Sequence, residues 1–321
     1  MQIKSMTLHP YEIILTHGLV RSGALIQLID EKANCGWGEV APLPNWSKEN
    51  LDECFKQLDR QHQALLQMDW TLLNCFENLS QLGLLPSVEF GLESALLSLL
   101  APVESCSLPA CALLMGSLPS ILDQARMRRM EGYTSAKLKV SQLSFEEARD
   151  AIELLKDHFE LRIDVNRAWN TSDSIRFFEQ FPLETFDYVE EPFSNPHDLA
   201  LFPHPLAVDE SFPKNLSLEQ LESLPTLKAL IYKPTMQGGM CGCLPLLEWT
   251  VKRGITLVLS SSFETDVGLA HIGAMACRLG LSSPIGVGTY HYLPALFCAD
   301  LQFLNGKAHV LGKPVLKRPR V

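Results

Sequence analysis

Two lysines lie two residues apart in the apolar segment Ala136-Lys137-Leu138-Lys139-Val140. Side chains of a β-strand alternate between its two faces, so Lys137 and Lys139 would point to the same side of a strand. Two ammonium groups in one site destabilise the doubly protonated state, which predicts a lowered pKa for at least one of them. Such a lysine could act as a base near neutral pH. Taken alone, the pair is also typical of the solvated face of an edge strand.

Four more charged residues each end an apolar, strand-like segment: Asp164, Glu190, Asp209 and Lys233. From Lys139 onward the steps are 25, 26, 19 and 24 residues, each about one strand-plus-helix unit. Parallel barrels keep their chemistry at the carboxyl ends of the strands, so these side chains should meet at one mouth. Three carboxylates placed together repel one another unless a cation joins them. Ligation by oxygen alone favours Mg²⁺, with Mn²⁺ as a possible substitute, over zinc.

A lysine beside a divalent cation could remove a proton from the carbon next to a carboxylate. The cation and Lys233 would hold the developing negative charge while Lys139 takes the proton. Each residue also has an ordinary structural reading, as a helix cap, a strand end or a solvated lysine. Five strand ends that all carry the required charge argue against that reading and indicate an enzyme acting on a small carboxylate.

The elements that would position these residues begin at Pro109, where short apolar strands start to alternate with helical stretches. Eight strands are expected: Ala110–Leu114, Ser135–Val140, Leu161–Val165, Tyr188–Glu190, Leu206–Asp209, Ala229–Lys233, Thr256–Leu259 and Pro284–Val287. Helices are expected at Phe145–Phe159, Asp173–Phe181, Leu218–Leu224, Leu244–Arg253 and Gly268–Leu279. Four prolines between Glu191 and Leu206 leave room for one short helix there. The pattern predicts an α/β fold with a (β/α)8-type barrel that lacks a regular helix at one end.

The first hundred residues have a different pattern. Strand-like runs up to about residue 40 predict an antiparallel meander, and two amphipathic runs follow, from Ser47 to about Leu66 and from Val88 to Leu100 with Ser87 as its cap. We expect an α+β domain over 1–105, a catalytic barrel over 106–293, and a segment 294–321 that returns to the first domain. Possible strands in that segment are Ala299–Leu304 and His309–Leu311.

Composition narrows the function classes. The formal net charge of −10 disfavours nucleic acid and anionic membranes as partners, and the basic tail Lys317–Arg320 reads as a solvated end. No long uncharged apolar run and no signal sequence is found, so we expect a cytoplasmic protein. Nine scattered cysteines without a Cys-x-x-Cys motif predict reduced core thiols.

Six ordered segments of the second region, together with Gly36–Pro44 in the first, resemble the enolase superfamily and within it the o-succinylbenzoate synthases of menaquinone biosynthesis. The six are Ala136–Lys139, Leu161–Trp169, Val189–Pro192, Val208–Ser211, Ile231–Thr235 and Ser260–Thr265. The resemblance implies a modified TIM-type (β/α)7β barrel whose mouth is capped by the first, α+β domain. It also implies syn elimination of water from 2-succinyl-6-hydroxy-2,4-cyclohexadiene-1-carboxylate, giving aromatic 2-succinylbenzoate.

By the same resemblance, Asp164, Glu190 and Asp209 would bind Mg²⁺. Lys139 would be the general base and would return its proton to the leaving hydroxyl. Lys137 would favour the neutral form of Lys139 and contact the substrate carboxylate, and Lys233 would stabilise the ene-diolate. The remaining residues implied for the metal strand and substrate pocket are Arg162, Asn166, Ser260, Ser261 and Ser262.

The loops Thr16–Gly23 and Pro44–Lys48 would close over the barrel mouth and exclude water, and Arg21 could meet a substrate carboxylate there. The glycine-rich segment Met236–Met240 receives no role. We expect a monomer or a small homo-oligomer.

Three alternatives stay open. The superfamily's N-succinylamino acid racemases and dipeptide epimerases use two lysines on opposite faces of the α-carbon. A Schiff-base aldolase could use a strand lysine as its nucleophile. A barrel without catalytic activity could serve as a binding module.

Overall fold

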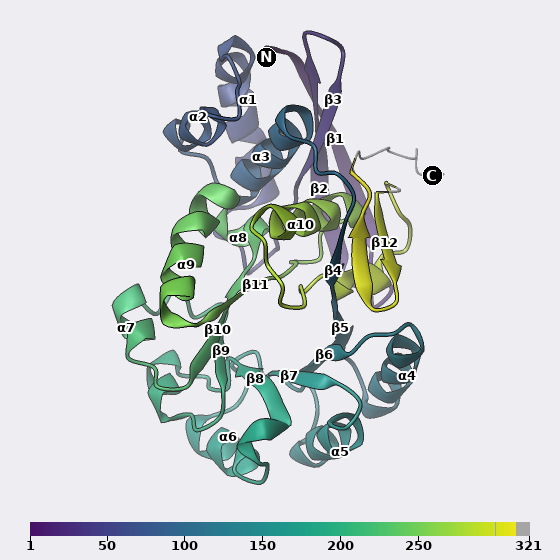
Figure 1. The fold of residues 1–321 in the computed structure, drawn as a ribbon, viewed down its shortest axis with the longest axis vertical. Helices are drawn as coiled ribbons and strands as arrows, with labels where there is room; N and C mark the ends of the chain where they lie inside the picture. Colours follow the sequence, from purple (N-terminus) through teal and green to yellow (C-terminus); the bar gives the residue numbers. More distant parts are fainter. Residues whose placement is uncertain (299, 313–321) are drawn as a thin grey trace.

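The computed structural model describes residues 1–298 and 300–312, which form a β-rich capping domain above a curled sheet of parallel strands (Figure 1). The basic tail Lys317–Arg320 lies outside the described residues. No helix within them is both long and apolar enough to cross a membrane. The boundaries assigned to the three predicted segments stay predictions.

The capping domain carries the expected meander, since its three strands pair antiparallel in the order β1-β2-β3. Its elements are β1 (Ile3–Ile14), β2 (Val20–Asp30), β3 (Cys35–Val40), α1 (Leu51–Gln67), α2 (Cys75–Gln81) and α3 (Pro86–Leu100). Helix α1 starts later than predicted because Asn50 and Glu53 form a capping box at Leu51. Helix α3 lies directly on β3: a Cβ atom on Gly38 would overlap the carbonyl oxygen of Gly91.

The second region is a parallel sheet in the chain order β5 to β11. Its strands are β5 (Cys111–Leu114), β6 (Ser135–Lys139), β7 (Glu160–Asp164), β8 (Phe186–Glu190), β9 (Leu206–Val208), β10 (Leu227–Tyr232) and β11 (Thr256–Leu259). Its helices are α4 (Leu118–Met130), α5 (Phe145–Leu155), α6 (Thr171–Phe178), α7 (Leu218–Glu222), α8 (Pro234–Gln237), α9 (Met240–Arg253) and α10 (Asp266–Arg278). In the proline-rich crossover the structure has one short 3-10 helix, Pro196–Leu201, as expected.

The eighth predicted strand, Pro284–Val287, is not a regular strand, and this correction has a local cause. Pro284 has no amide hydrogen to donate, and the chain enters a 3-10 helix at Gly288. Between them, Ile285 exchanges hydrogen bonds with Pro109 and Cys111, while Gly286 donates to Leu259 and accepts from Ser261. These contacts on both sides join the two edges of the sheet, so the ring still closes.

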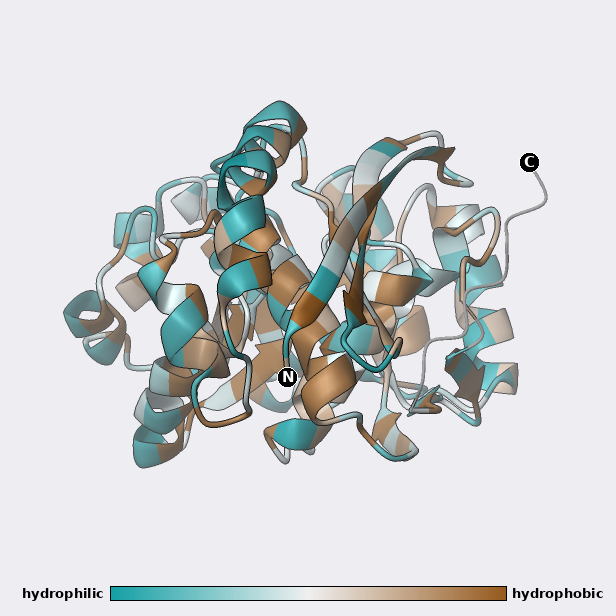
Figure 2. Cartoon of the chain, turned by 90° about the horizontal axis from the view of Figure 1, so that it is seen from above, coloured by the Kyte–Doolittle hydropathy of each residue, from teal (hydrophilic) through white to brown (hydrophobic). Residues whose placement is uncertain are grey.

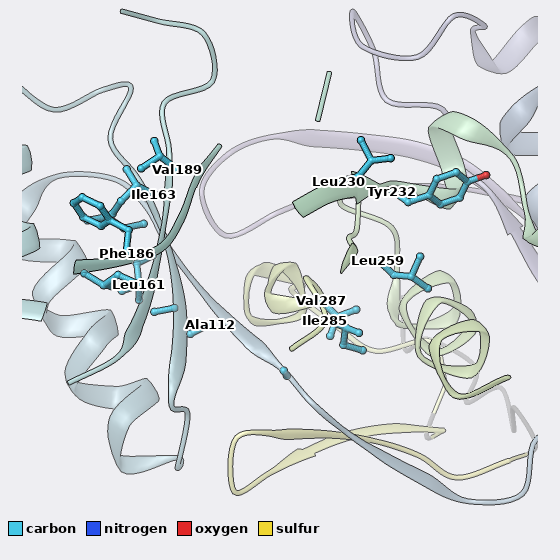
Figure 3. Close-up of a cluster of buried hydrophobic side chains, with 14 of the residues drawn as sticks. Ala112, Leu161, Ile163, Phe186, Val189, Leu230, Tyr232, Leu259, Ile285 and Val287 are labelled. Atoms are coloured by element: carbon cyan, nitrogen blue, oxygen red, sulfur yellow. The ribbon is translucent and has the colours of Figure 1, made fainter. Parts of the chain in front are cut away.

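Strand alternation divides the barrel into an apolar outer layer and a polar mouth. Figure 3 shows Leu161 and Ile163 of β7 beside Phe186 and Val189 in the buried layer under the helices. The intervening residues of β7 point into the barrel, where the floor is a small apolar cluster of Tyr188, Ala207, Ala229, Ile231 and Val258. Hydrophobic residues gather toward the interior and hydrophilic ones cover the outer helix faces (Figure 2).

The C-terminal segment forms a hairpin, β12 (Leu301–Leu304) and β13 (Lys307–Val310), which pairs with β4 (Cys106–Pro109) beside α10 (Figure 1). In this corner Cys106 and Cys277 form a disulfide. The expectation of nine reduced core thiols is therefore wrong for this pair, and Cys35 is exposed. Sequence could not show the pairing, because the two cysteines are 171 residues apart and only the fold brings them together.

Candidate active site

The charged strand ends form two rows across the barrel mouth. Lys139, Asp164 and Glu190 are in register on β6, β7 and β8. Lys137 lies one row deeper, on the same face of β6 as Lys139, as strand alternation predicts. Lys233 directly follows β10, four places from β6 in the sheet order and thus across the mouth from Lys139.

A cavity of about 150 Å³ opens between these strand ends. It brings together nine of the predicted site residues: Lys137, Lys139, Arg162, Asn166, Glu190, Lys233, Ser260, Ser261 and Ser262. Leu43 and Trp46 of the capping domain also line it, so the loop Pro44–Lys48 reaches the mouth as expected. Asp164 and Asp209 are almost fully buried beneath it.

Lysines and carboxylates are interleaved in this site. The ammonium nitrogen of Lys137 lies 2.8 Å from Asp164 Oδ2 and 2.6 Å from Glu190 Oε1. Lys139 Nζ lies 3.5 Å from the same Asp164 oxygen and donates a hydrogen bond to Asn166 Oδ1 at 3.0 Å. On the other side, Lys233 forms an ion pair with Asp209.

These contacts decide the charge states. Burial lowers the pKa of Lys137, but the carboxylates of Asp164 and Glu190 outweigh it and hold this pKa well above its ordinary value. Lys137 therefore does not have the lowered pKa that was predicted for at least one of the two lysines, because it lies between two carboxylates. Burial also lowers the pKa of Lys233, and Asp209 more than compensates, raising it to about 12.

The carboxylates respond in opposite directions. Burial would raise the pKa of Asp164, but Lys137 and Lys139 hold it below its ordinary value. Burial and the neighbouring Asp164 hold the pKa of Glu190 well above the usual range. The lysines alone thus compensate the negative charge of Glu190 only poorly.

A candidate cation site lies on the Glu190 side of the mouth. Oxygens of Glu190, Asp209 and Glu210 lie within 4.8 Å of one another. Glu190 Oε2 and both carboxyl oxygens of Glu210 are buried and accept no hydrogen bond from any described residue. Asp164 is not in this group, since the ammonium of Lys137 lies between it and Glu190. An all-oxygen, acidic donor set of this kind suits Mg²⁺ better than zinc.

Two glutamates of this region were not predicted. Glu210 follows Asp209 directly, and burial together with Asp209 raises the pKa of Glu210 to about 8. Glu191 accepts hydrogen bonds from the backbone amides of Asp209 and Ser211, both at 2.9 Å, and from the Ser211 hydroxyl. Glu191 thereby fixes the end of β9. Both lie in doubled acidic pairs, Glu190-Glu191 and Asp209-Glu210, which is the signal that could have identified them.

The three serines differ in their partners. The Ser261 hydroxyl donates to Gly286 O at 2.9 Å and lies 2.7 Å from the Thr289 hydroxyl. The Ser260 hydroxyl reaches Gly286 O at 3.4 Å. The buried Ser262 hydroxyl has no hydrogen-bond partner among the described residues. Ser262 lines the cavity, and a ligand bound there could become the partner of its hydroxyl.

The structure places two predicted arginines in structural networks. Arg162, on the cavity floor, donates to Asp187, Ser283 and Pro284, and its guanidinium stacks on Tyr188. Arg21 was expected in a mouth loop, but it lies in β2 and is fully buried. Its guanidinium donates to the carbonyls of Ala41, Pro42 and Phe263, so Arg21 does not meet the other site residues.

Comparison with known proteins matches both regions. Residues 120–314 match the family model for the enolase C-terminal domain-like family, and residues 4–99 match the model for the MenC N-terminal domain. The chain is 28% identical over 313 residues to the o-succinylbenzoate synthase of Pasteurella multocida, covering 89% of each.

Solved structures show the same fold. MenC from Desulfotalea psychrophila superposes with a TM-score of 0.79 at 20% identity, over 97% of this chain and 100% of that one. A dipeptide epimerase from Methylococcus capsulatus, complexed with Mg and a dipeptide, superposes with a TM-score of 0.83 at 19% identity, over 98% of each chain. The chain belongs to the enolase superfamily and, within it, to the MenC family.

Proposed function

We propose that this protein is an o-succinylbenzoate synthase, a Mg²⁺-dependent hydro-lyase that converts 2-succinyl-6-hydroxy-2,4-cyclohexadiene-1-carboxylate into 2-succinylbenzoate. One observation carries the proposal: Lys139 and Lys233 line opposite sides of one cavity, with acidic strand ends between them. The similarity to curated o-succinylbenzoate synthases supports this choice of substrate.

Asp164, Glu190 and Asp209, the three carboxylates expected from the sequence, are the proposed cation ligands. The ammonium of Lys137 lies between Asp164 and Glu190 in the structure, so it would have to move aside for Asp164 to join the other two. The buried Glu190 Oε2 accepts no hydrogen bond from a described residue, so this oxygen could serve as a cation ligand. Bound Mg²⁺ would polarise the substrate carboxylate and offset the negative charge that develops on it. Lys233, held by Asp209, places a fixed positive charge on the opposite side of the substrate.

Lys139 carries the proton in this proposal. Its amine removes the proton from the carbon that bears the carboxylate, and the electron pair moves into that carboxylate. The bond between the neighbouring carbon and its hydroxyl then breaks, and Lys139 returns its proton to the departing oxygen as water. Asn166 accepts a hydrogen bond from Lys139 and orients the amine, while Trp46 and Leu43 limit the access of water.

The test is an absorbance assay for formation of the aromatic product from the cyclohexadiene carboxylate. We expect turnover with Mg²⁺, loss of turnover after chelation, and recovery when Mg²⁺ is restored. Turnover that survives exhaustive chelation, or its absence in a metal-loaded, folded protein, would overturn the proposal.

Racemisation or epimerisation at an α-carbon is the second candidate, and the two lysines on opposite sides of the cavity favour it. One lysine could remove a proton from one face while the other delivers a proton to the opposite face. Incubation with N-succinyl amino acids or dipeptides in D₂O distinguishes the two candidates. Rapid α-deuterium exchange with racemisation, and no dehydration of the cyclohexadiene, would make this the main activity.

A further inference from the structure

The glycine-rich segment Met236–Met240, which follows the active-site Lys233, lies against helix α3 of the capping domain. Helix α8 and α3 are in extensive contact, and Figure 1 shows α3 above the α8–α9 corner. On α3, Glu89 and Glu93 are four residues apart and so share one face. Glu93 Oε1 accepts a hydrogen bond from the Met240 amide at 2.7 Å. A Cβ atom at Gly239 would overlap the Glu93 carboxyl group, so any other residue at this position would displace that carboxyl group.

Among the residues that the structure describes, no basic side chain forms an ion pair with either of these carboxyl groups. Glu93 is only 2% exposed, and its Oε2 accepts no hydrogen bond within the described part of the chain. Burial raises the pKa of Glu93 to about 7, and Glu89 adds to the effect. Arg278, which acts in the opposite direction, donates its hydrogen bond to the carbonyl of Ala101. A buried carboxylate in this position requires a positive charge or a proton.

A thiol completes the group. Oxygens of Glu89 and Glu93 and the sulfur of Cys241 lie within 4.8 Å of one another. In the structure the Cys241 thiol donates a weak hydrogen bond to Phe76 O at 3.6 Å, and a bound cation would displace its proton to solvent. Two carboxylates with the resulting thiolate would form a borderline-soft donor set, which suits Zn²⁺ rather than Mg²⁺. The hydrogen bond from Met240 to Glu93 supports the carboxylate in the way that outer-shell hydrogen bonds support metal ligands.

We propose that Glu89, Glu93 and Cys241 bind a zinc-type divalent cation between the capping domain and the barrel, at a site separate from the barrel mouth. The cation would tie α3 to the first turn of α9. Tyr232, which precedes Lys233, donates its hydroxyl toward the carbonyls of Gly238 and Gly239, so the same segment is also tied to the end of β10. The site therefore holds the capping domain against the loop that follows an active-site lysine.

Cobalt titration of the chelator-treated protein, with the Cys106–Cys277 disulfide left intact, tests the proposal, since Co²⁺ replaces Zn²⁺ and reports a thiolate ligand by charge-transfer absorption in the near ultraviolet. We expect the unmodified protein to develop this band with one equivalent of Co²⁺, and Zn²⁺ to remove it by competition. If the unmodified protein showed no thiolate band, or showed one only at a large excess of Co²⁺, the proposal would be overturned regardless of the results with the variants. In that case the two carboxyl groups share a proton.

Four variants identify the residues that give rise to the band. Cys241→Ser should abolish it, and Glu93→Gln should weaken Co²⁺ binding at this site by about tenfold or more. Cys35→Ser is the matched control, because Cys35 is an exposed free thiol that should not contribute. Asp209→Asn should leave the thiolate band unchanged, which separates this site from the proposed Mg²⁺ site. A band that survives in Cys241→Ser and disappears in Cys35→Ser would assign the signal to an adventitious surface thiolate and refute the site.

Discussion

Two groups of buried charges in this molecule differ in how completely they are satisfied. At the interface between capping domain and barrel, Glu39 accepts hydrogen bonds from Tyr11, from the Thr265 amide and hydroxyl, and from the Gly268 amide. The guanidinium of Arg21 donates hydrogen bonds to three carbonyl oxygens. At the barrel mouth, oxygens of Glu190 and Glu210 accept no hydrogen bond from a described residue.

The difference separates structural charges from chemical ones. A buried charge with every partner in place stabilises one arrangement of the two domains and has nothing left to offer a ligand. A buried carboxyl oxygen without a partner costs free energy in the absence of a ligand, and this cost is recovered when a cation or substrate arrives. Substitutions in the first group should therefore affect stability, and those in the second should affect turnover.

The largest effect is expected for Glu190→Gln. In the proposed enzyme this change removes a cation ligand worth several kcal/mol at the transition state, so kcat/KM should fall by about 10⁴-fold. Glutamine has the size of glutamate and removes a charge that burial and Asp164 disfavour, but it also loses the ion pair with Lys137, so we expect only a small net change in stability. Steady-state kinetics and urea unfolding measure the two quantities. A large loss of stability would place Glu190 in the structural group.

Lys139→Ala should lower kcat/KM by about a thousandfold, within the range that positioned general acid–base groups supply. The side chain is 28% exposed, and its contacts with described residues, Asp164 and Asn166, lie at the mouth, so the unfolding temperature should change little. Lys252→Ala is the control, because that lysine forms an exposed ion pair with Glu248 on α9. Equal activity of the two variants would remove Lys139 from the chemistry.

Glu39→Gln tests the other side of the comparison. The variant loses charge-assisted hydrogen bonds to Thr265 and Gly268 at the start of α10, so the free energy of unfolding should fall by about 2–3 kcal/mol. Urea denaturation measures the fall, with the exposed Glu12→Gln as the control. The kcat/KM of the folded fraction should stay within severalfold of the parent. A loss of turnover larger than the loss of folded protein would mean that Glu39 acts on the site.

The strand ends could be predicted from sequence because each depends on local pattern. Alternation with period two placed Lys137 and Lys139 on one face, and spacing by strand-plus-helix units placed Glu190 and Lys233 at the same mouth. The superfamily and its fold were likewise predicted from the ordered motifs and are confirmed. The site's assignments as ligands and bases stay predictions.

What sequence did not predict depends on contacts between distant segments. Arg21 was assigned to a loop, yet β2 already begins at Val20. The guanidinium of Arg21 donates hydrogen bonds to carbonyl oxygens, one of them on Phe263, 242 residues away. The pairing of Cys106 with Cys277 and the use of Glu191 as a support for Asp209 have the same origin. Local pattern specifies which side chains face inward, whereas their partners are set by tertiary packing.

The smallest effects are expected for two adjacent serines. Like the two groups of charges, they differ in whether the polar group has a hydrogen-bond partner among the described residues. Ser262→Ala removes a buried hydroxyl without a described partner, so KM should rise by about three- to tenfold, which corresponds to one hydrogen bond, at unchanged stability. Ser261→Ala removes a hydroxyl already bound to Gly286 and Thr289, so it should lower the unfolding free energy by about 1 kcal/mol and leave KM nearly unchanged. Kinetics and urea unfolding on both variants measure the contrast. If Ser261→Ala raised KM and Ser262→Ala lowered the unfolding free energy instead, a buried polar group without a partner would not indicate a ligand contact in this protein.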